Sequence, residues 1–115
     1  MDSVRKPQRA RNERYMSMTG KDRASLRSEA HHLSVKVHVG HVGLTPALLG
    51  SLDDVLRTHE LVKCQVSKAG ELSAKEAAQQ AATQLKAEII QVIGRTFTLY
   101  RENPELERGE LPPWR

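Results

Sequence analysis

The sequence predicts a two-layer α/β domain of the α+β kind, with its elements in the order αβαβαββ. Two observations support this prediction. Within residues 19–102 the spacing of apolar residues alternates between the helical period and the two-residue period of a strand. Helix caps and glycine turns separate these segments. At 115 residues the chain has room for one core. We therefore expect a four-stranded mixed sheet with three helices on one face.

The first half of this domain contains two helices around one strand. Thr19 is the expected N-cap of a helix that turns Leu26 and Ala30 inward and ends near residues 31–33. Residues 34–39 then alternate valine with polar residues, which indicates a half-buried strand. Thr45 and Pro46 are a typical N-cap and first residue for the second helix. Its apolar stripe comprises Leu48, Leu49, Leu52, Val55 and Leu56.

The second half adds three strands and one helix. Residues 60–66 form the second strand, with Val62, Cys64 and Val66 on one face. Ser73 and Glu76 form a capping box for a third helix that continues to about Leu85. Residues 89–101 read as a hairpin that turns at Gly94–Arg95 and places Phe97 and Leu99 inward. We expect the face of the sheet without helices to carry Lys36, His38, Lys63, Gln65 and Tyr100.

The two ends of the chain differ in composition from this domain. Residues 1–18 are polar and Arg-rich, and we expect a flexible basic arm there, followed by the domain at 19–102 and an irregular tail at 103–115. Residues 1–30 hold eight basic and four acidic side chains, whereas the remainder holds ten of each. All of the net charge of +4 therefore lies in the first quarter, which favours a polyanionic partner.

The turn between the first strand and the second helix is a G-x-x-G motif at Gly40-His41-Val42-Gly43. Two glycines allow the main chain to turn sharply and to approach a ligand without a Cβ in the way. The helix that follows directs its unpaired N–H groups and the positive end of its dipole toward the same place. This arrangement suits a phosphate, although an ordinary strand-to-helix turn also uses glycine.

Five short matches, in order, give the chain a family resemblance. They are His31-His32-Leu33, Val-Gly-x-x-Gly-Leu-Thr-Pro at 39–46, His59-Glu60-Leu61-Val62-Lys63, Gln91-Val92-Ile93-Gly94-Arg95 and Leu99-Tyr100-Arg101. Over residues 20–102 the chain resembles the CRM domain (chloroplast RNA splicing and ribosome maturation), in its stand-alone bacterial YhbY-like form. The resemblance implies an RNA-binding fold similar to the C-terminal domain of translation initiation factor 3, with a KH-like glycine loop. It also implies an association of bacterial members with precursors of the large ribosomal subunit.

The candidate RNA-binding residues follow from the motif and from the distribution of charge. A KH-like loop clamps the RNA backbone through its main chain. The loop and helix start contribute Gly40, His41, Val42, Gly43 and Thr45, and the sheet and hairpin contribute Lys36, Lys63, Arg95 and Arg101. Family members often carry a lysine or another polar residue inside the loop, whereas this loop has His41 and Val42. For each basic residue the alternative is a solvated surface position.

Other classes of function find little support in the sequence. The chain has neither a G-x-x-x-x-G-K-[ST] phosphate loop nor a G-x-S-x-G nucleophile elbow, so we expect no enzymatic activity and no cofactor. Five histidines and the single cysteine, Cys64, do not have the spacing of a closed zinc site, so we expect no metal. No apolar run is long enough for a membrane span, which suggests a cytoplasmic protein.

We therefore expect a monomeric, non-enzymatic RNA-binding protein that assists ribosome assembly. Its expected partner is large-subunit rRNA on a pre-50S particle, with a ribosomal protein as a further contact. The alternative is a protein–protein adaptor on the ribosome or on an RNA enzyme, with the basic arm only localising it. A continuous basic surface that joins the loop and the sheet would favour RNA, whereas an exposed apolar patch would favour the adaptor.

Overall fold

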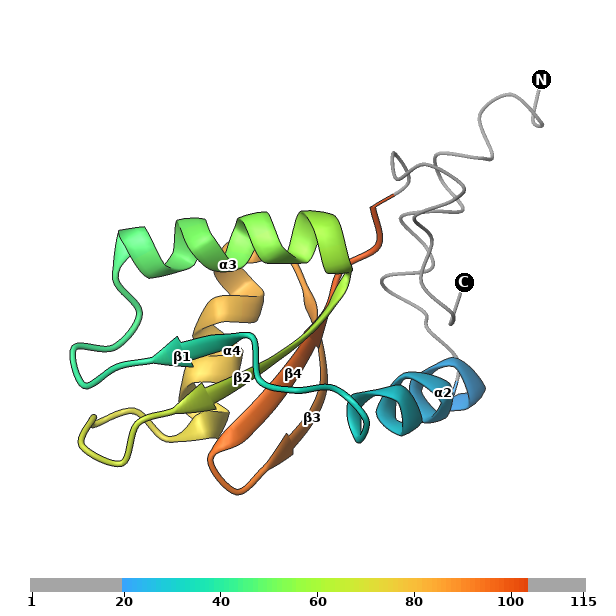
Figure 1. The fold of residues 1–115 in the computed structure, drawn as a ribbon, viewed down its shortest axis with the longest axis horizontal. Helices are drawn as coiled ribbons and strands as arrows, with labels where there is room; N and C mark the ends of the chain where they lie inside the picture. Colours follow the sequence, from blue (N-terminus) through green and yellow to red (C-terminus); the bar gives the residue numbers. More distant parts are fainter. Residues whose placement is uncertain (1–19, 104–115) are drawn as a thin grey trace.

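A four-stranded mixed sheet organises the domain (Figure 1). The computed structural model describes residues 20–103, and its elements follow the predicted order αβαβαββ. The bounds are α2 Gly20–Ala30, β1 Val37–Val39, α3 Pro46–His59, β2 Leu61–Val66, α4 Ala74–Leu85, β3 Glu88–Ile93 and β4 Thr96–Tyr100. The strand order is β1-β2-β4-β3, with β1 parallel to β2 and the other pairs antiparallel. The expected arm at 1–18, Thr19 and nearly all of the tail at 103–115 lie outside the described residues.

The main core lies between the sheet and the helices α3 and α4. The strands contribute Val62, Cys64, Phe97 and Leu99, all fully buried. The predicted inward faces of these strands are thus confirmed. The helix α3 buries Leu52 and Leu56, and α4 covers the strands with the buried alanines Ala74, Ala77, Ala78 and Ala81. Because these side chains are small, α4 lies close to the sheet and excludes water from the strand residues beneath it.

The prediction that all three helices cover one face of the sheet is wrong for α2, which lies on the face opposite α3 and α4. Its Leu26 packs in a separate cluster with Leu61, Ile90 and Tyr100, and partly with Leu33. Successive residues of a strand point to opposite faces, so Leu61 faces α2 while its neighbour Val62 faces the main core. The second face carries these three apolar side chains at one end, and α2 removes them from water.

Tyr100 is therefore not an exposed residue of an open face, as the sequence suggested, since only 6 % of it is accessible. Arg23 fixes α2 in place by donating to the Glu88 carboxylate at 2.7 Å and to the carbonyl oxygen of Ile89 at 3.1 Å. In Figure 1, α2 lies at the end of the sheet away from the β1–α3 turn. Within residues 20–103, no helix covers the sheet face near that turn.

The first strand is shorter than predicted, with ladder pairing at only three of the six residues from 34 to 39. The chain must cross from α2, on one face, to the edge of the sheet before it can pair with β2. The second strand begins after Glu60, which caps α3 with a positive φ of 64°. The capping box of Ser73 and Glu76 is present as predicted, with hydrogen bonds of 3.1 and 2.9 Å.

Candidate nucleic-acid interface

The Gly40–Gly43 loop is a tight turn at the end of β1. The Gly43 amide donates to the Gly40 carbonyl oxygen at 3.0 Å, which closes a four-residue turn. Gly43 has φ +83°, a conformation that costs little only for glycine. His41 and Val42 occupy the two central positions and both are exposed, Val42 at 69 % of its surface. The turn therefore presents its main chain and these two side chains to solvent.

The start of α3 continues this donor surface. The Thr45 hydroxyl accepts a hydrogen bond from the Leu48 amide at 3.1 Å, and Pro46 occupies the first helical position. The N-cap predicted at Thr45 is confirmed. Within residues 20–103, the amides of His41, Val42 and Ala47 have no protein acceptor. These N–H groups at the positive end of the α3 dipole are available to an anion.

A second loop supports the first. The Ser67 amide donates to the Val39 carbonyl oxygen at 2.9 Å, so the chain after β2 runs beside the start of the glycine turn. Gly70 packs directly against that turn: a Cβ there would lie 3.4 Å from the Gly40 carbonyl oxygen and from the His41 Cα. The sequence reasoning missed Gly70, because its role depends on a contact with a segment 30 positions earlier. A glycine in the Lys68–Gly70 turn was the only local signal.

A basic pocket lies beside the two loops. Its volume is about 320 Å³, and it is lined by His38, Val39, Gly40, Gln65, Val66, Ser67, Lys68 and Arg95. The tip of the β3–β4 hairpin reaches it because the Val66 amide donates to the Arg95 carbonyl oxygen at 2.8 Å. Sequence reasoning placed Arg95 among the site residues but did not select Lys68. The pocket joins the glycine loop to the face of the sheet that α2 leaves uncovered.

Lys36 and Lys63 extend the positive charge along the same face. Strand alternation places both on the face of His38, opposite the main core, and the Lys36 amide donates to the Lys63 carbonyl oxygen at 2.9 Å. Lys36 is exposed and Lys63 is half-buried. At this end of the sheet, residues 36–46, 63–70 and 91–97 contain no Asp or Glu, and the exposed Glu71 follows Gly70. Carboxylates from these segments thus neither neutralise the basic groups nor repel an anionic ligand.

Arg101, which the sequence analysis placed among the RNA-contacting residues, is engaged by contacts within the domain. Its guanidinium donates to the Asp53 carboxylate at 2.8 Å, to the Leu85 carbonyl oxygen at 2.9 Å and to the Asp53 carbonyl oxygen at 3.2 Å. Only 17 % of the side chain is exposed. It follows Tyr100, which pairs with Leu61 at the end of β2 farthest from the glycine loop. Arg101 therefore connects α3 to the end of α4.

Metal and thiol chemistry find no structural support in the described part of the chain. Residues 20–103 contain no group of three His, Cys, Asp or Glu side chains that could hold a metal ion. Cys64 is fully buried in the main core, and burial raises the pKa of its thiol to about 12. The thiol is therefore neutral and unreactive at physiological pH. No helix among the described residues has both the length and the apolar character to cross a bilayer.

The fold and this surface define a class: an α+β domain with a glycine turn that exposes main-chain donors beside a basic pocket. The model of the CRS1 / YhbY (CRM) domain matches residues 18–101, and the chain belongs to that family. The predicted resemblance is thereby confirmed.

Two named relatives match most of this chain at about one third sequence identity. The chain is 33 % identical over 95 residues to the probable RNA-binding protein YqeI of Bacillus subtilis, covering 83 % of this chain and 99 % of that protein. It is 32 % identical over 89 residues to an RNA-binding protein of Haemophilus influenzae, covering 77 % of this chain and 90 % of that one.

A solved structure has the same fold. The solution structure of the hypothetical protein SAV1595 from Staphylococcus aureus, described as a candidate RNA-binding protein, superposes with a TM-score of 0.59. The two sequences are 32 % identical, and the match covers 82 % of this chain and 98 % of that chain. The arrangement of three helices around a four-stranded mixed sheet is thus shared with a structure determined by experiment.

Proposed function

We propose that this protein binds RNA, without catalysing a reaction, and that it assists assembly of the large ribosomal subunit by holding rRNA of the pre-50S particle. The observation that carries the proposal is the Gly40–Gly43 turn, whose free amides lie beside a basic pocket. Phosphate contacts supply most of the affinity of such surfaces. The names of the relatives from Bacillus and Haemophilus support RNA as the ligand. Membership of the CRM family supports the ribosomal role.

In this proposal the RNA backbone lies across the turn. The amides of His41, Val42 and Ala47 donate to phosphate oxygens, and the Gly40 position lets the backbone approach closely because a Cβ there would meet nothing within 4 Å. Lys36, Lys63, Lys68 and Arg95 contact neighbouring phosphates along the uncovered sheet face. Thr45 acts indirectly, by capping α3 and holding its first turn beside the loop.

The adaptor alternative has less support on this surface. Among the described residues the exposed large apolar side chains are Val42, Val92 and Ile93. Val42 lies in the loop, whereas Val92 and Ile93 lie on the edge strand β3, so the three do not make one broad patch around the basic pocket. A surface of basic side chains without a continuous apolar area favours a nucleic acid over a protein partner.

Sedimentation of cell extracts tests this proposal. Extract is run on a sucrose gradient at low magnesium, with wild-type protein, a loop variant H41D/V42D and its neutral control H41N/V42N. We expect the wild type and the Asn control to migrate with the large subunit or its precursor, and the Asp variant to stay at the top. A wild-type protein confined to the top of the gradient would contradict the assembly role. It would leave another RNA or the adaptor alternative.

A further inference from the structure

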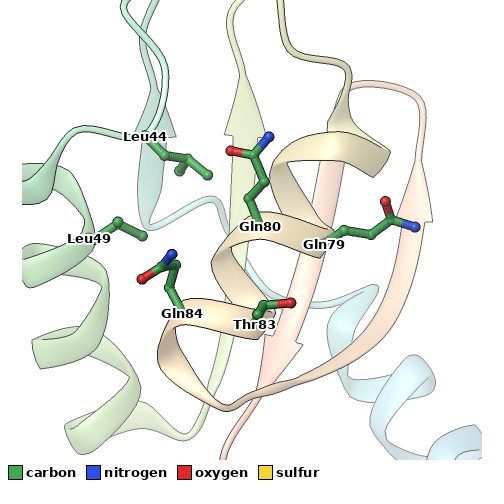
Figure 2. A pocket seen from close by; sticks show the side chains of 6 residues that line it. All are labelled: Leu44, Leu49, Gln79, Gln80, Thr83 and Gln84. Atoms are coloured by element: carbon green, nitrogen blue, oxygen red, sulfur yellow. The ribbon is translucent and has the colours of Figure 1, made fainter.

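A second pocket lies on the helical side of the glycine turn, separate from the basic pocket. It has a volume of about 430 Å³ between α3 and α4, and is lined by Leu44, Leu49, Gln79, Gln80, Thr83 and Gln84. Figure 2 shows Gln80 and Gln84 extending from α4 toward the side where Leu44 and Leu49 lie. Leu44 directly follows Gly43, so this groove begins one residue after the turn that we propose to hold phosphate.

The chemistry of this lining is neutral and rich in hydrogen-bonding groups. None of the six lining residues is charged, in contrast to the basic pocket on the other side of the turn. The three glutamine side chains are exposed and have no hydrogen-bond partner within residues 20–103. Each amide offers both a donor and an acceptor, which is what the edge of a nucleobase requires. Leu44 and Leu49, both half-buried, provide an apolar wall against which a flat ring can pack.

Gln80 and Gln84 are positioned to hydrogen-bond together to one ligand in the groove. They are four residues apart on α4, so their side chains lie on the same face of the helix, one turn apart. Neither is needed for the core, which α4 builds from its alanines. The glycine turn and this groove therefore suit the two parts of one nucleotide. The turn offers N–H donors to the charged phosphate, and the two amides and the apolar wall suit the uncharged base.

We propose that the groove between α3 and α4 binds an unpaired base of the RNA strand whose backbone the Gly40–Gly43 turn holds. Gln80 and Gln84 hydrogen-bond to the edge of that base while Leu44 and Leu49 contact its ring. The inference rests on the proposed function and adds to it: the protein recognises single-stranded RNA and discriminates among bases. A base-paired strand does not bind in the groove, because the hydrogen-bonding edges of its bases are already used in base pairs.

The test compares base preference with backbone affinity in the full-length protein. Labelled single-stranded decamers of adenylate, cytidylate and uridylate, and a duplex of equal length, are titrated by fluorescence anisotropy at several salt concentrations. The variant is Q80M/Q84M, which keeps side-chain length and helix propensity and removes the amides. Ser51→Ala, at an exposed position of α3, serves as the control.

We expect the wild type to prefer one decamer over the others by about tenfold or more, and to bind the duplex more weakly. The Met variant should reduce that preference to about threefold or less, while its salt dependence stays that of the wild type and Ser51→Ala changes neither.

A wild-type protein that binds all three decamers equally would overturn the inference. So would a Met variant with unchanged preference, which would leave the groove to another occupant, such as a peptide. In both cases RNA binding that is lost in H41D/V42D would leave the proposed function standing. Absence of any RNA binding by the wild type would instead contradict both proposals.

Discussion

The loop variant H41D/V42D separates RNA binding from folding. His41 and Val42 are exposed and occupy the central positions of a turn, where Asp and Asn are favoured residues. Neither side chain contributes to the core clusters. We therefore expect both the Asp and the Asn variants to fold with an unfolding free energy within about 0.5 kcal/mol of the wild type. The two variants differ from each other only in charge, since Asn and Asp have nearly the same shape.

The expected loss of affinity follows from Coulomb's law. A carboxylate and a phosphate about 4 Å apart repel each other by about 1 kcal/mol in water, so two carboxylates cost about 2 kcal/mol. That cost corresponds to an affinity weaker by about thirtyfold, at about 1.4 kcal/mol per factor of ten. The repulsion survives physiological salt, because the Debye length of about 8 Å exceeds this separation.

Fluorescence anisotropy with a labelled single-stranded RNA measures this difference, and thermal unfolding followed by circular dichroism checks that all three proteins fold. We expect the Asn variant to bind nearly as the wild type does and the Asp variant to bind about thirtyfold more weakly. Equal affinities of the Asp and Asn variants, with both folded, would refute the proposal that phosphate lies at the turn.

Four further predictions follow from the structure. Gly43→Ala should lower the unfolding free energy by about 1–2 kcal/mol because of its φ of +83°, whereas Gly40→Ala, which has open space and no positive φ, should not; thermal melts compare them. Arg101→Met should cost about 1–3 kcal/mol in urea unfolding and leave the salt dependence of RNA binding unchanged. Deletion of residues 1–18, which carry five basic side chains, should flatten the slope of log affinity against log salt by up to about 3.5; an unchanged slope would contradict a role for this arm. Cys64 should react with a thiol reagent at pH 8 only after denaturation, since its pKa of about 12 keeps the buried thiol protonated; fast labelling of the native protein would exclude the buried position.

Local signals in the sequence determined the elements and the turn. The capping box at Ser73, the N-cap at Thr45 and the glycine turn after β1 depend on residues at most three or four positions apart. The inward faces of β2 and β4 follow from strand alternation, which is also local. These parts of the fold and of the candidate site were therefore predictable without any knowledge of tertiary contacts.

Contacts between distant segments decided the rest. The contact of Leu26 with Leu61 and Tyr100 decides which face of the sheet α2 covers. Because α2 is only weakly amphipathic, its own sequence does not indicate which segment it packs against. In the sequence Arg101 is indistinguishable from a solvated basic residue, because the Asp53 carboxylate that accepts its hydrogen bond lies 48 positions earlier.

The same division applies to the two pockets beside the glycine turn. The sequence by itself determined the family, the order of elements and the phosphate-suited turn, because backbone preferences and caps act over a few residues. Only the tertiary structure decided that Lys68 and Gly70 join that turn, and that Gln80 and Gln84 face Leu44 across a groove. Such juxtapositions arise from packing α3 and α4 on one sheet face, and packing is not encoded at any single position.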